Sequence, residues 1–257
     1  YKIASQDAKN AKDGELVEAE QVGPRKRLGL ASARIIEVLG DPMAPRSISL
    51  IAIHQHEIPD HFPDDVLFEA GQAGAVELGE RTDLRNLPLF TIDPSDARDH
   101  DDAICAKPDD DPNNIGGHIV WVAIADVAYY VQPGSSIDIE ARKRGNSSYF
   151  PDRVVPMLPD ALSGNLCSLH EGVDRACMSV CIKLSAEGTK LDHQFHRGIM
   201  RSPASLSYEQ AQGAFDGNYD NVTKPLAKAL KDLLLAYKSA SKARDKRHPL
   251  SLDLRER

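Results

Sequence analysis

Long apolar runs are missing from this sequence. No stretch of its 257 residues approaches the roughly 18–20 consecutive apolar residues of a membrane-spanning helix, and the opening segment Tyr1–Gln6 lacks the apolar core of a signal peptide. We therefore expect a cytoplasmic protein with no membrane partner. Hydrophobic residues still make up 41 % of the chain, enough to bury a core in one large domain or two smaller ones.

Cysteine is scarce, with only Cys105, Cys167, Cys177 and Cys181 in the chain. The Cys177-x3-Cys181 spacing is a weak indication of zinc, because no further Cys or His pair stands at ligand spacing. Apolar or strand-like sequence surrounds the four residues, as is typical of buried, reduced thiols in a cytosolic protein. We interpret them in that way.

Several phosphate- and metal-binding motifs are also missing. The chain has no Gly-rich phosphate loop of the Walker type and no His-Glu-x-x-His segment. A calcium loop needs Gly at its sixth position and Glu at its twelfth. Counted from Asp93, those positions hold Arg98 and Ile104, so this pattern fails too. The net charge of −8 does not exclude a nucleic-acid partner, because part of it lies in one acidic cluster that cations would neutralise.

That cluster is the most informative feature present. Five aspartates, at positions 93, 96, 99, 101 and 102, directly follow an apolar stretch. A solvated acidic loop is the simplest alternative, but Ile92, Ala103 and Ile104 flank the acids and should fix them at the edge of a core. Carboxylates this close repel one another unless cations compensate them. Oxygen-only ligand sets select hard ions such as Mg²⁺, Mn²⁺ or Ca²⁺, and paired ions ~3.5–4 Å apart usually serve phosphate-ester chemistry.

The spacing Asp93-x5-Asp99-x-Asp101-Asp102 resembles the catalytic signature of the RNB exoribonucleases, the family of ribonucleases R and II. Trp121–Val131 and Arg144–Pro159 resemble the next blocks of that family, in the same order, and the likeness covers roughly residues 80–257. The sequences of Asp96–Asp99 and Tyr149–Val154 are most similar to those of the ribonuclease R branch.

The resemblance implies an α+β fold with three parts. Residues 1–57 should be a partial OB or cold-shock-like barrel, residues 58–79 a connector, and residues 80–257 an RNB catalytic domain that is truncated at its C-terminal side. In the barrel, the apolar patterns predict strands at 16–20, 33–39 and 47–53. A short helix over 64–70 is expected in the connector, because carboxylates stand in its first turn.

The expected elements of the catalytic domain alternate between strands and helices, which favours an α+β arrangement. Strands are predicted at 87–92, 118–131, 178–184 and 193–200. A helix over 136–144 should begin at the capping residue Ser135 and end at Gly145. A second helix, over 225–246, should turn one apolar face to the core, formed by Leu226, Leu230, Leu233, Leu234 and Tyr237.

Each acid has an expected role. The resemblance implies that Asp93 and Asp102 bind Mg²⁺ (or Mn²⁺), that Asp99 shares the site, and that Asp101 holds a second ion or orients the attacking water. In an extended segment Asp99 and Asp101 share one face and Asp102 points to the other, so the chain must turn there for all of them to meet. Asp96 lies outside the core spacing.

Three further residues are candidate RNA ligands. Tyr149 is expected to stack on a base, with a core tyrosine as the alternative. Arg153 and Arg175 are expected to contact the RNA backbone. We interpret His100 as local packing, Trp121 as a core residue, and His54, His56 and His61 as ordinary surface residues.

The favoured function is that of a Mg²⁺-dependent 3′→5′ exoribonuclease that hydrolyses single-stranded RNA from its 3′ end to 5′-nucleoside monophosphates. The alternative is a non-catalytic RNA-binding segment of a degenerate nuclease, against which the complete aspartate set argues. A phosphohydrolase of small esters is a distant third. The family domain continues past position 257, so we also expect the missing C-terminal half of the same protein as a partner, covering apolar surface.

Overall fold

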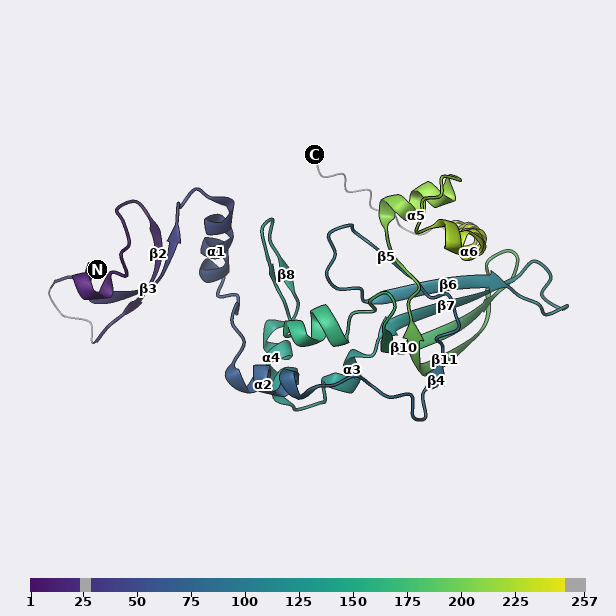
Figure 1. Cartoon of the computed structure of the whole chain (residues 1–257), viewed down its shortest axis with the longest axis horizontal. Coiled ribbons are helices and arrows are strands. Elements are labelled where there is room, and N and C mark those ends of the chain that lie inside the picture. Colours follow the sequence, from purple (N-terminus) through teal and green to yellow (C-terminus); the bar gives the residue numbers. More distant parts are fainter. Residues whose placement is uncertain (24–28, 248–257) are drawn as a thin grey trace. The chain divides into compact units, whose positions relative to one another are not determined.

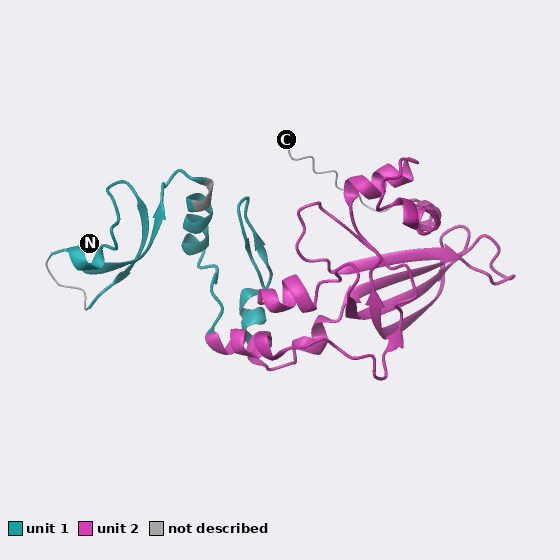
Figure 2. Cartoon of the chain, viewed as in Figure 1, with its two compact units in different colours: residues 1–63, 139–157 teal, residues 64–138, 158–257 magenta. Residues whose placement is uncertain are grey.

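The computed structural model describes residues 1–23 and 29–247. The chain divides into two compact units, shown in Figure 2. The first unit comprises residues 1–63 and 139–157, and the second comprises residues 64–138 and 158–257. Residues 139–157 thus group with the N-terminal part of the chain, although they lie within the stretch that the sequence assigns to the catalytic domain.

The first unit contains a three-stranded sheet of order β1-β3-β2 (Figure 1). β1 (Lys2–Ile3) runs parallel to β3 (Ser32–Gly40), and β2 (Leu16–Gln21) runs antiparallel to it. Ala33 and Ile35 of β3 are both buried, which is the alternation expected of a half-buried strand. The strands predicted at 16–20 and 33–39 are confirmed. A 3₁₀ turn, η1 (Ser5–Asp7), follows β1.

The strand predicted at 47–53 is wrong, because these residues belong to helix α1 (Pro45–Gln55). The run of β-branched isoleucines suggested a strand. The proline at the start of α1 suits the first helical turn. Leu50 and Ile53, three residues apart, are buried, whereas Ile48 is 55 % exposed. Burial at helical spacing thus outweighs the strand preference of the individual residues.

The second unit is built on a five-stranded sheet of order β4-β11-β10-β7-β6. The strands are β4 (Thr82–Asp83), β6 (Asp102–Pro108), β7 (His118–Ala125), β10 (Asp174–Leu184) and β11 (Lys190–Arg201). All neighbours are antiparallel except β11 and β4. The strands predicted at 178–184 and 193–200 are confirmed and are longer than expected. The strand predicted at 118–131 ends at Ala125, and the short helix α3 (Val127–Tyr130) follows it.

Helix α6 (Ala227–Asp245) packs on β6 and β7 and closes the main core. It follows a 3₁₀ turn, η3 (Lys224–Leu226), which contains the proline expected in the helix itself. The buried stripe on α6 runs through Leu230, Leu233, Ala236 and Ala243. Tyr237 was expected on this face but is 61 % exposed, because the stripe continues through small alanines that let the helix approach the sheet and leaves the tyrosine outside it.

A parallel pair of short strands, β5 (Thr91–Asp93) and β12 (Ser205–Ser207), lies beside the sheet. The predicted strand at 87–92 is therefore shorter and later than expected, since the proline at position 88 interrupts it. Ser207 also starts helix α5 (Tyr208–Phe215) through a reciprocal capping box with Gln210.

The following elements complete the described fold. They are α2 (Asp64–Gln72), α4 (Ser136–Arg144), the hairpin of β8 (Ser148–Tyr149) and β9 (Val154–Val155), and the π-helical turn η2 (Leu162–Leu166). Both predicted helices, at 64–70 and 136–144, are confirmed, and the Ser135 hydroxyl accepts a hydrogen bond from the Asp138 amide at 3.3 Å. Among the helices described here, none has the length and apolar character needed to cross a bilayer.

Candidate metal and RNA site

The two ends of the aspartate segment are held by separate strand pairings. Asp93 is the last residue of β5, which pairs with β12, and Asp102 is the first residue of β6, which pairs with β7. Between them, the carbonyl of Asp101 accepts a hydrogen bond of 2.9 Å from the Ala125 amide. Ala103 is fully buried. The expectation that core residues anchor the acids at the edge of a core is thereby confirmed.

His100 binds one of these acids directly. Its Nδ1 lies 2.7 Å from Oδ2 of Asp93, and both side chains are about 15 % exposed. The edge of a second imidazole, that of His170, lies against the His100 ring, with 5.8 Å between the ring centroids. The interpretation of His100 as local packing was therefore incomplete. Its position between two of the signature aspartates was the only sequence signal for this contact.

The acids also act on one another electrostatically. The pKa of Asp101 is raised, first by partial desolvation and then by the negative charges of Asp99, Asp102 and Asp93. The pKa of Asp102 is raised by desolvation and by Asp93. Each charged carboxylate therefore disfavours the ionisation of its neighbours, and a divalent cation relieves this repulsion. The donor set, made of carboxylate oxygens, fits Mg²⁺ or Mn²⁺ rather than a soft metal.

The acids do not form a complete set of metal ligands among the described residues. Within residues 1–23 and 29–247, no three His, Cys, Asp or Glu side chains converge closely enough to hold a metal ion. Asp102 already belongs to a strand, whereas Asp99 lies in the preceding loop. The four acids thus influence one another's charge, although their oxygens do not converge on one point among the described residues.

An open pocket of about 430 Å³ adjoins the acids. Its walls come from the loop after β5 and from the β12–α5 junction, and they are formed by Pro94, Ser95, Ala97, His100, Ser205, Leu206, Ser207 and Gln210. The imidazole that binds Asp93 is therefore also a wall of this pocket.

Tyr149 and Arg153 belong to the first unit, on the β8–β9 hairpin. Tyr149 is 70 % exposed, so the alternative of a core tyrosine is wrong. The guanidinium of Arg153 donates a hydrogen bond of 3.0 Å to Asp152, whose carboxylate also accepts one from the Ser49 hydroxyl. The hairpin therefore presents an aromatic ring together with a partly compensated positive charge.

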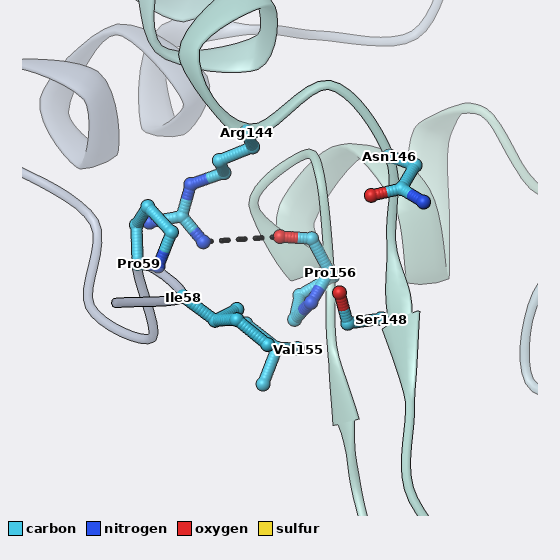
Figure 3. Close-up of a pocket in the computed structure, with 7 residues that line it drawn as sticks. All are labelled: Ile58, Pro59, Arg144, Asn146, Ser148, Val155 and Pro156. Atoms are coloured by element: carbon cyan, nitrogen blue, oxygen red, sulfur yellow. Dashed lines mark hydrogen bonds between the residues drawn. The ribbon is translucent and has the colours of Figure 1, made fainter. Parts of the chain in front are cut away.

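A buried arginine fixes the base of this hairpin (Figure 3). Arg144 donates hydrogen bonds to Glu140 (2.9 Å), to the carbonyl of Pro156 (3.1 Å) and to the carbonyl of His61 (2.6 Å). Its guanidinium also lies 3.6 Å from the ring centroid of Phe62. Its side chain is 2 % exposed. Because one fork binds three separate segments, Arg144 holds the strands that carry Tyr149 in place.

Arg175 lies in the second unit and is also buried. Its guanidinium donates hydrogen bonds to the carbonyl of Ser168 (2.9 Å) and to Oδ1 of Asn165 (3.0 Å). The group thus faces the protein interior, which argues against the expected contact with an RNA phosphate.

Asp126 is a buried acid that sequence reasoning did not single out. Its carboxylate is fully buried and lies 2.8 Å from a guanidinium nitrogen of Arg81 and 3.0 Å from one of Arg197. The residue directly follows β7, within one of the blocks that resemble the RNB family. Two guanidinium groups compensate its charge, and it therefore ties the end of β7 to β11 and to the segment before β4.

The other side chains singled out by sequence take ordinary positions. Trp121 is partly exposed, and its ring centroid lies 5.1 Å from that of the tilted His196 ring, so its assignment to the core is wrong. The histidines at 54, 56 and 61 are exposed, as predicted. All four cysteines are free and three are buried; burial raises the pKa of the Cys105 and Cys167 thiols to about 12.

Comparison with known domains identifies the protein family of this fold. Residues 81–257 match the RNB domain and residues 1–63 match a cold shock domain. The predicted fold class, a cold-shock-type barrel ahead of an α+β RNB domain, is confirmed. The chain belongs to the RNB family.

Within that family the chain is similar to ribonuclease R, as expected. It is 42 % identical over 255 residues to ribonuclease R of Escherichia coli (strain K12), which covers 96 % of this chain and 30 % of that protein. It is 40 % identical over 263 residues to ribonuclease R of Vibrio parahaemolyticus, covering 98 % and 30 %. The chain thus spans about 30 % of the length of these relatives.

Solved structures agree. RNase R of Mycoplasma genitalium in complex with ribose-methylated single-stranded RNA superposes with a TM-score of 0.82 at 26 % identity, covering 99 % of this chain and 40 % of that one. Yeast Ssd1, a pseudonuclease, superposes with a TM-score of 0.62 at 16 % identity, covering 92 % and 30 %, and shares the fold alone.

Proposed function

We propose that this chain carries the metal-binding part of a Mg²⁺-dependent 3′→5′ exoribonuclease that hydrolyses single-stranded RNA to 5′-nucleoside monophosphates. The observation that carries the proposal is the anchored aspartate segment, in which Asp93 ends β5, Asp102 begins β6 and the carbonyl of Asp101 accepts a hydrogen bond from the Ala125 amide. The membership in the RNB family supports it, and Mn²⁺ would fit the same oxygen ligands.

Hydrolysis of a phosphodiester needs an activated water, stabilised charge on the phosphate, and a stabilised leaving oxygen. Bound Mg²⁺ supplies the charge stabilisation and lowers the pKa of water. We assign Asp93, Asp99 and Asp102 to holding the ion. His100 binds Oδ2 of Asp93, so the other oxygen of that carboxylate would be the one available to an ion. Asp101 shares a second ion or accepts the hydrogen bond that orients the attacking water.

Tyr149 is the proposed RNA contact in the first unit. Its ring is largely exposed, and stacking on a base suits a nuclease without sequence preference because every base has a π-face. Arg153, next to it on the same hairpin, would contact the RNA backbone while Asp152 limits its net charge.

The additional length of the ribonuclease R relatives suggests a partner within the same protein. Asp102, Ile124 and Met178 stand in register on three neighbouring strands, and the two apolar side chains are 47 % and 39 % exposed. We propose that further sequence of the full-length protein covers this apolar surface beside the acids.

The alternative, a non-catalytic RNA-binding segment, has one observation in its favour. Among the described residues, the acids do not form a closed ligand set. The complete aspartate signature opposes it, since a chain that only binds RNA has no need for four mutually repelling carboxylates.

Cleavage of 5′-end-labelled single-stranded RNA by the full-length protein tests the proposal. With Mg²⁺ we expect progressive shortening from the 3′ end and release of 5′-monophosphates. Asp101→Asn should abolish cleavage while RNA affinity survives. Cleavage that is unchanged by Asp101→Asn would reject the assignment, and binding without any cleavage by the unaltered protein would favour the alternative.

A further inference from the structure

A buried guanidinium and the aspartate segment are connected through one short stretch of chain. Arg175 donates to the carbonyl of Ser168 at 2.9 Å and to Oδ1 of Asn165 at 3.0 Å, with a longer contact of 3.4 Å to the carbonyl of Asp174. Ser168 itself is fully buried. The fork of Arg175 thus determines where the segment that follows the π-helical turn η2 lies.

The same segment binds the backbone of the aspartate loop. The Ser168 hydroxyl accepts a hydrogen bond of 3.0 Å from the amide of His100, and the amide of Leu169 donates one of 2.8 Å to the carbonyl of His100. His100 stands between Asp99 and Asp101 in the chain. Both peptide groups of the residue between these two acids are therefore fixed by Ser168 and Leu169.

We propose that Arg175 is a positioning residue for the aspartate site, and not an RNA ligand. Its guanidinium holds Ser168, Ser168 and Leu169 hold the backbone of His100, and that backbone sets the directions in which the neighbouring carboxylates point. The inference rests on the proposed function of those acids as metal ligands. Substitution of a residue that orients metal ligands without binding the metal itself typically changes metal affinity or activity by about 10–100-fold.

Arginine is the residue type that this position requires. Two acceptors on different residues are bound at once by a planar fork, whereas a lysine ammonium is a single point charge on a flexible stem. Arg175→Lys therefore keeps the buried positive charge but removes the planar group that binds both acceptors at once. An arginine that binds RNA phosphate would behave differently. Loss of one phosphate contact weakens RNA binding and reduces the slope of log affinity against log salt concentration by about one.

The test compares metal and RNA affinities of the full-length protein. Mn²⁺ binding is followed by electron paramagnetic resonance of the free ion, and RNA binding by fluorescence anisotropy in EDTA over a range of salt. For Arg175→Lys we expect at least about tenfold weaker Mn²⁺ binding and a similar fall in kcat with Mg²⁺. RNA affinity and its salt slope should be unchanged. Weaker RNA binding with a shallower slope and unchanged Mn²⁺ affinity would overturn the proposal, as would no change at all.

Two further variants control the test. Arg201→Lys alters a half-exposed arginine of β11 that pairs with Asp174 and has no described contact with Ser168 or Asn165, and it should leave Mn²⁺ affinity unchanged. Ser168→Ala removes only the acceptor for the His100 amide, so it tests the same connection if Arg175→Lys fails to fold. Weaker Mn²⁺ binding by Ser168→Ala supports the proposal, and unchanged binding contradicts it.

The parallel variant Asp101→Asn separates the two proposals. If Asp101→Asn loses cleavage while Arg175→Lys and Ser168→Ala behave like the unaltered protein, the proposed function stands and the role of Arg175 is wrong. If Asp101→Asn keeps full cleavage, the proposed function itself fails.

Discussion

Nδ1 of His100 lies 2.7 Å from Oδ2 of Asp93, within the segment that carries the five aspartates. The contact joins the end of β5 to the loop that leads into β6. It gives Asp93 a hydrogen-bond partner that opposes the repulsion from its neighbours, and under the proposed function the other carboxylate oxygen would be available to an ion.

Removal of this contact should destabilise the second unit. For His100→Ala we expect a loss of about 1–2 kcal/mol in the free energy of unfolding, since a partly buried acid loses its hydrogen-bond partner. Urea denaturation measures the loss. His56→Ala, at an exposed position of the first unit, is the control and should change little. Equal stability of His100→Ala and the unaltered protein would mean that the contact contributes nothing.

The turn between β10 and β11 requires glycine at position 188. Gly188 has a φ of +81°, and a Cβ there would lie 2.0 Å from the carbonyl oxygen of Ser239 in α6. Gly188→Ala should therefore cost more than the ~1–2 kcal/mol of the left-handed conformation alone. Gly134→Ala is the matched control, because its φ of +83° is similar and nothing lies within 4 Å. Similar losses of stability for both variants would contradict the close approach of α6.

Exposure of the Tyr149 ring predicts an effect on RNA binding without one on folding. Tyr149→Ala should weaken the affinity of the full-length protein for single-stranded RNA by about 1–3 kcal/mol, and Tyr149→Phe should restore most of it, because the π-face carries the contact. Tyr237→Ala, at a tyrosine that is 61 % exposed on α6, should bind RNA normally. Fluorescence anisotropy in EDTA measures all three, and normal affinity of Tyr149→Ala would exclude the stacking role.

Asp220 gives the chain an acid-sensitive turn. Its carboxylate accepts hydrogen bonds from the Thr223 amide, from Gln210 and from the Thr223 hydroxyl, and together they lower its pKa to about 2. A folded-state pKa below the unfolded value of 3.8 stabilises the fold above pH 3.8, and this contribution is lost as the pH falls toward 2.

Melting temperatures of the unaltered protein and of Asp220→Asn should therefore differ most above pH 4 and converge below it. Asp216→Asn is the comparison, at a nearby acid whose side chain has a single described hydrogen bond, from Gln212. A difference between Asp220→Asn and the unaltered protein that stays constant from pH 6 to pH 2 would show that the pKa of Asp220 is not lowered.

Local sequence pattern predicted much of the fold, and the exceptions have physical causes. Strands were predicted at 178–184 and 193–200, where β10 and β11 lie, and the start of α4 follows from its capping serine. The segment at 47–53 was misassigned because its β-branched residues favour a strand, whereas burial of Leu50 and Ile53 selects a helix.

The candidate site was predictable in composition but not in its supports. The aspartates stand in one short motif, which a single sequence displays. The hydrogen bond between His100 and Ser168 joins residues 68 positions apart. Arg175 comes close to Ser168 because β10 pairs with β7 and β11, and this pairing is a property of the folded sheet. A lone arginine beside an aspartate therefore looked like a surface phosphate ligand until its burial was known.

Isothermal titration calorimetry of the full-length protein with Mg²⁺ tests the central claim most directly. We predict saturable Mg²⁺ binding that Asp99→Asn or Asp102→Asn weakens by at least tenfold, while Asp96→Asn, outside the proposed ligand set, leaves it unchanged. An absence of Mg²⁺ binding, or equal binding by all three variants, would contradict a metal site built from these aspartates.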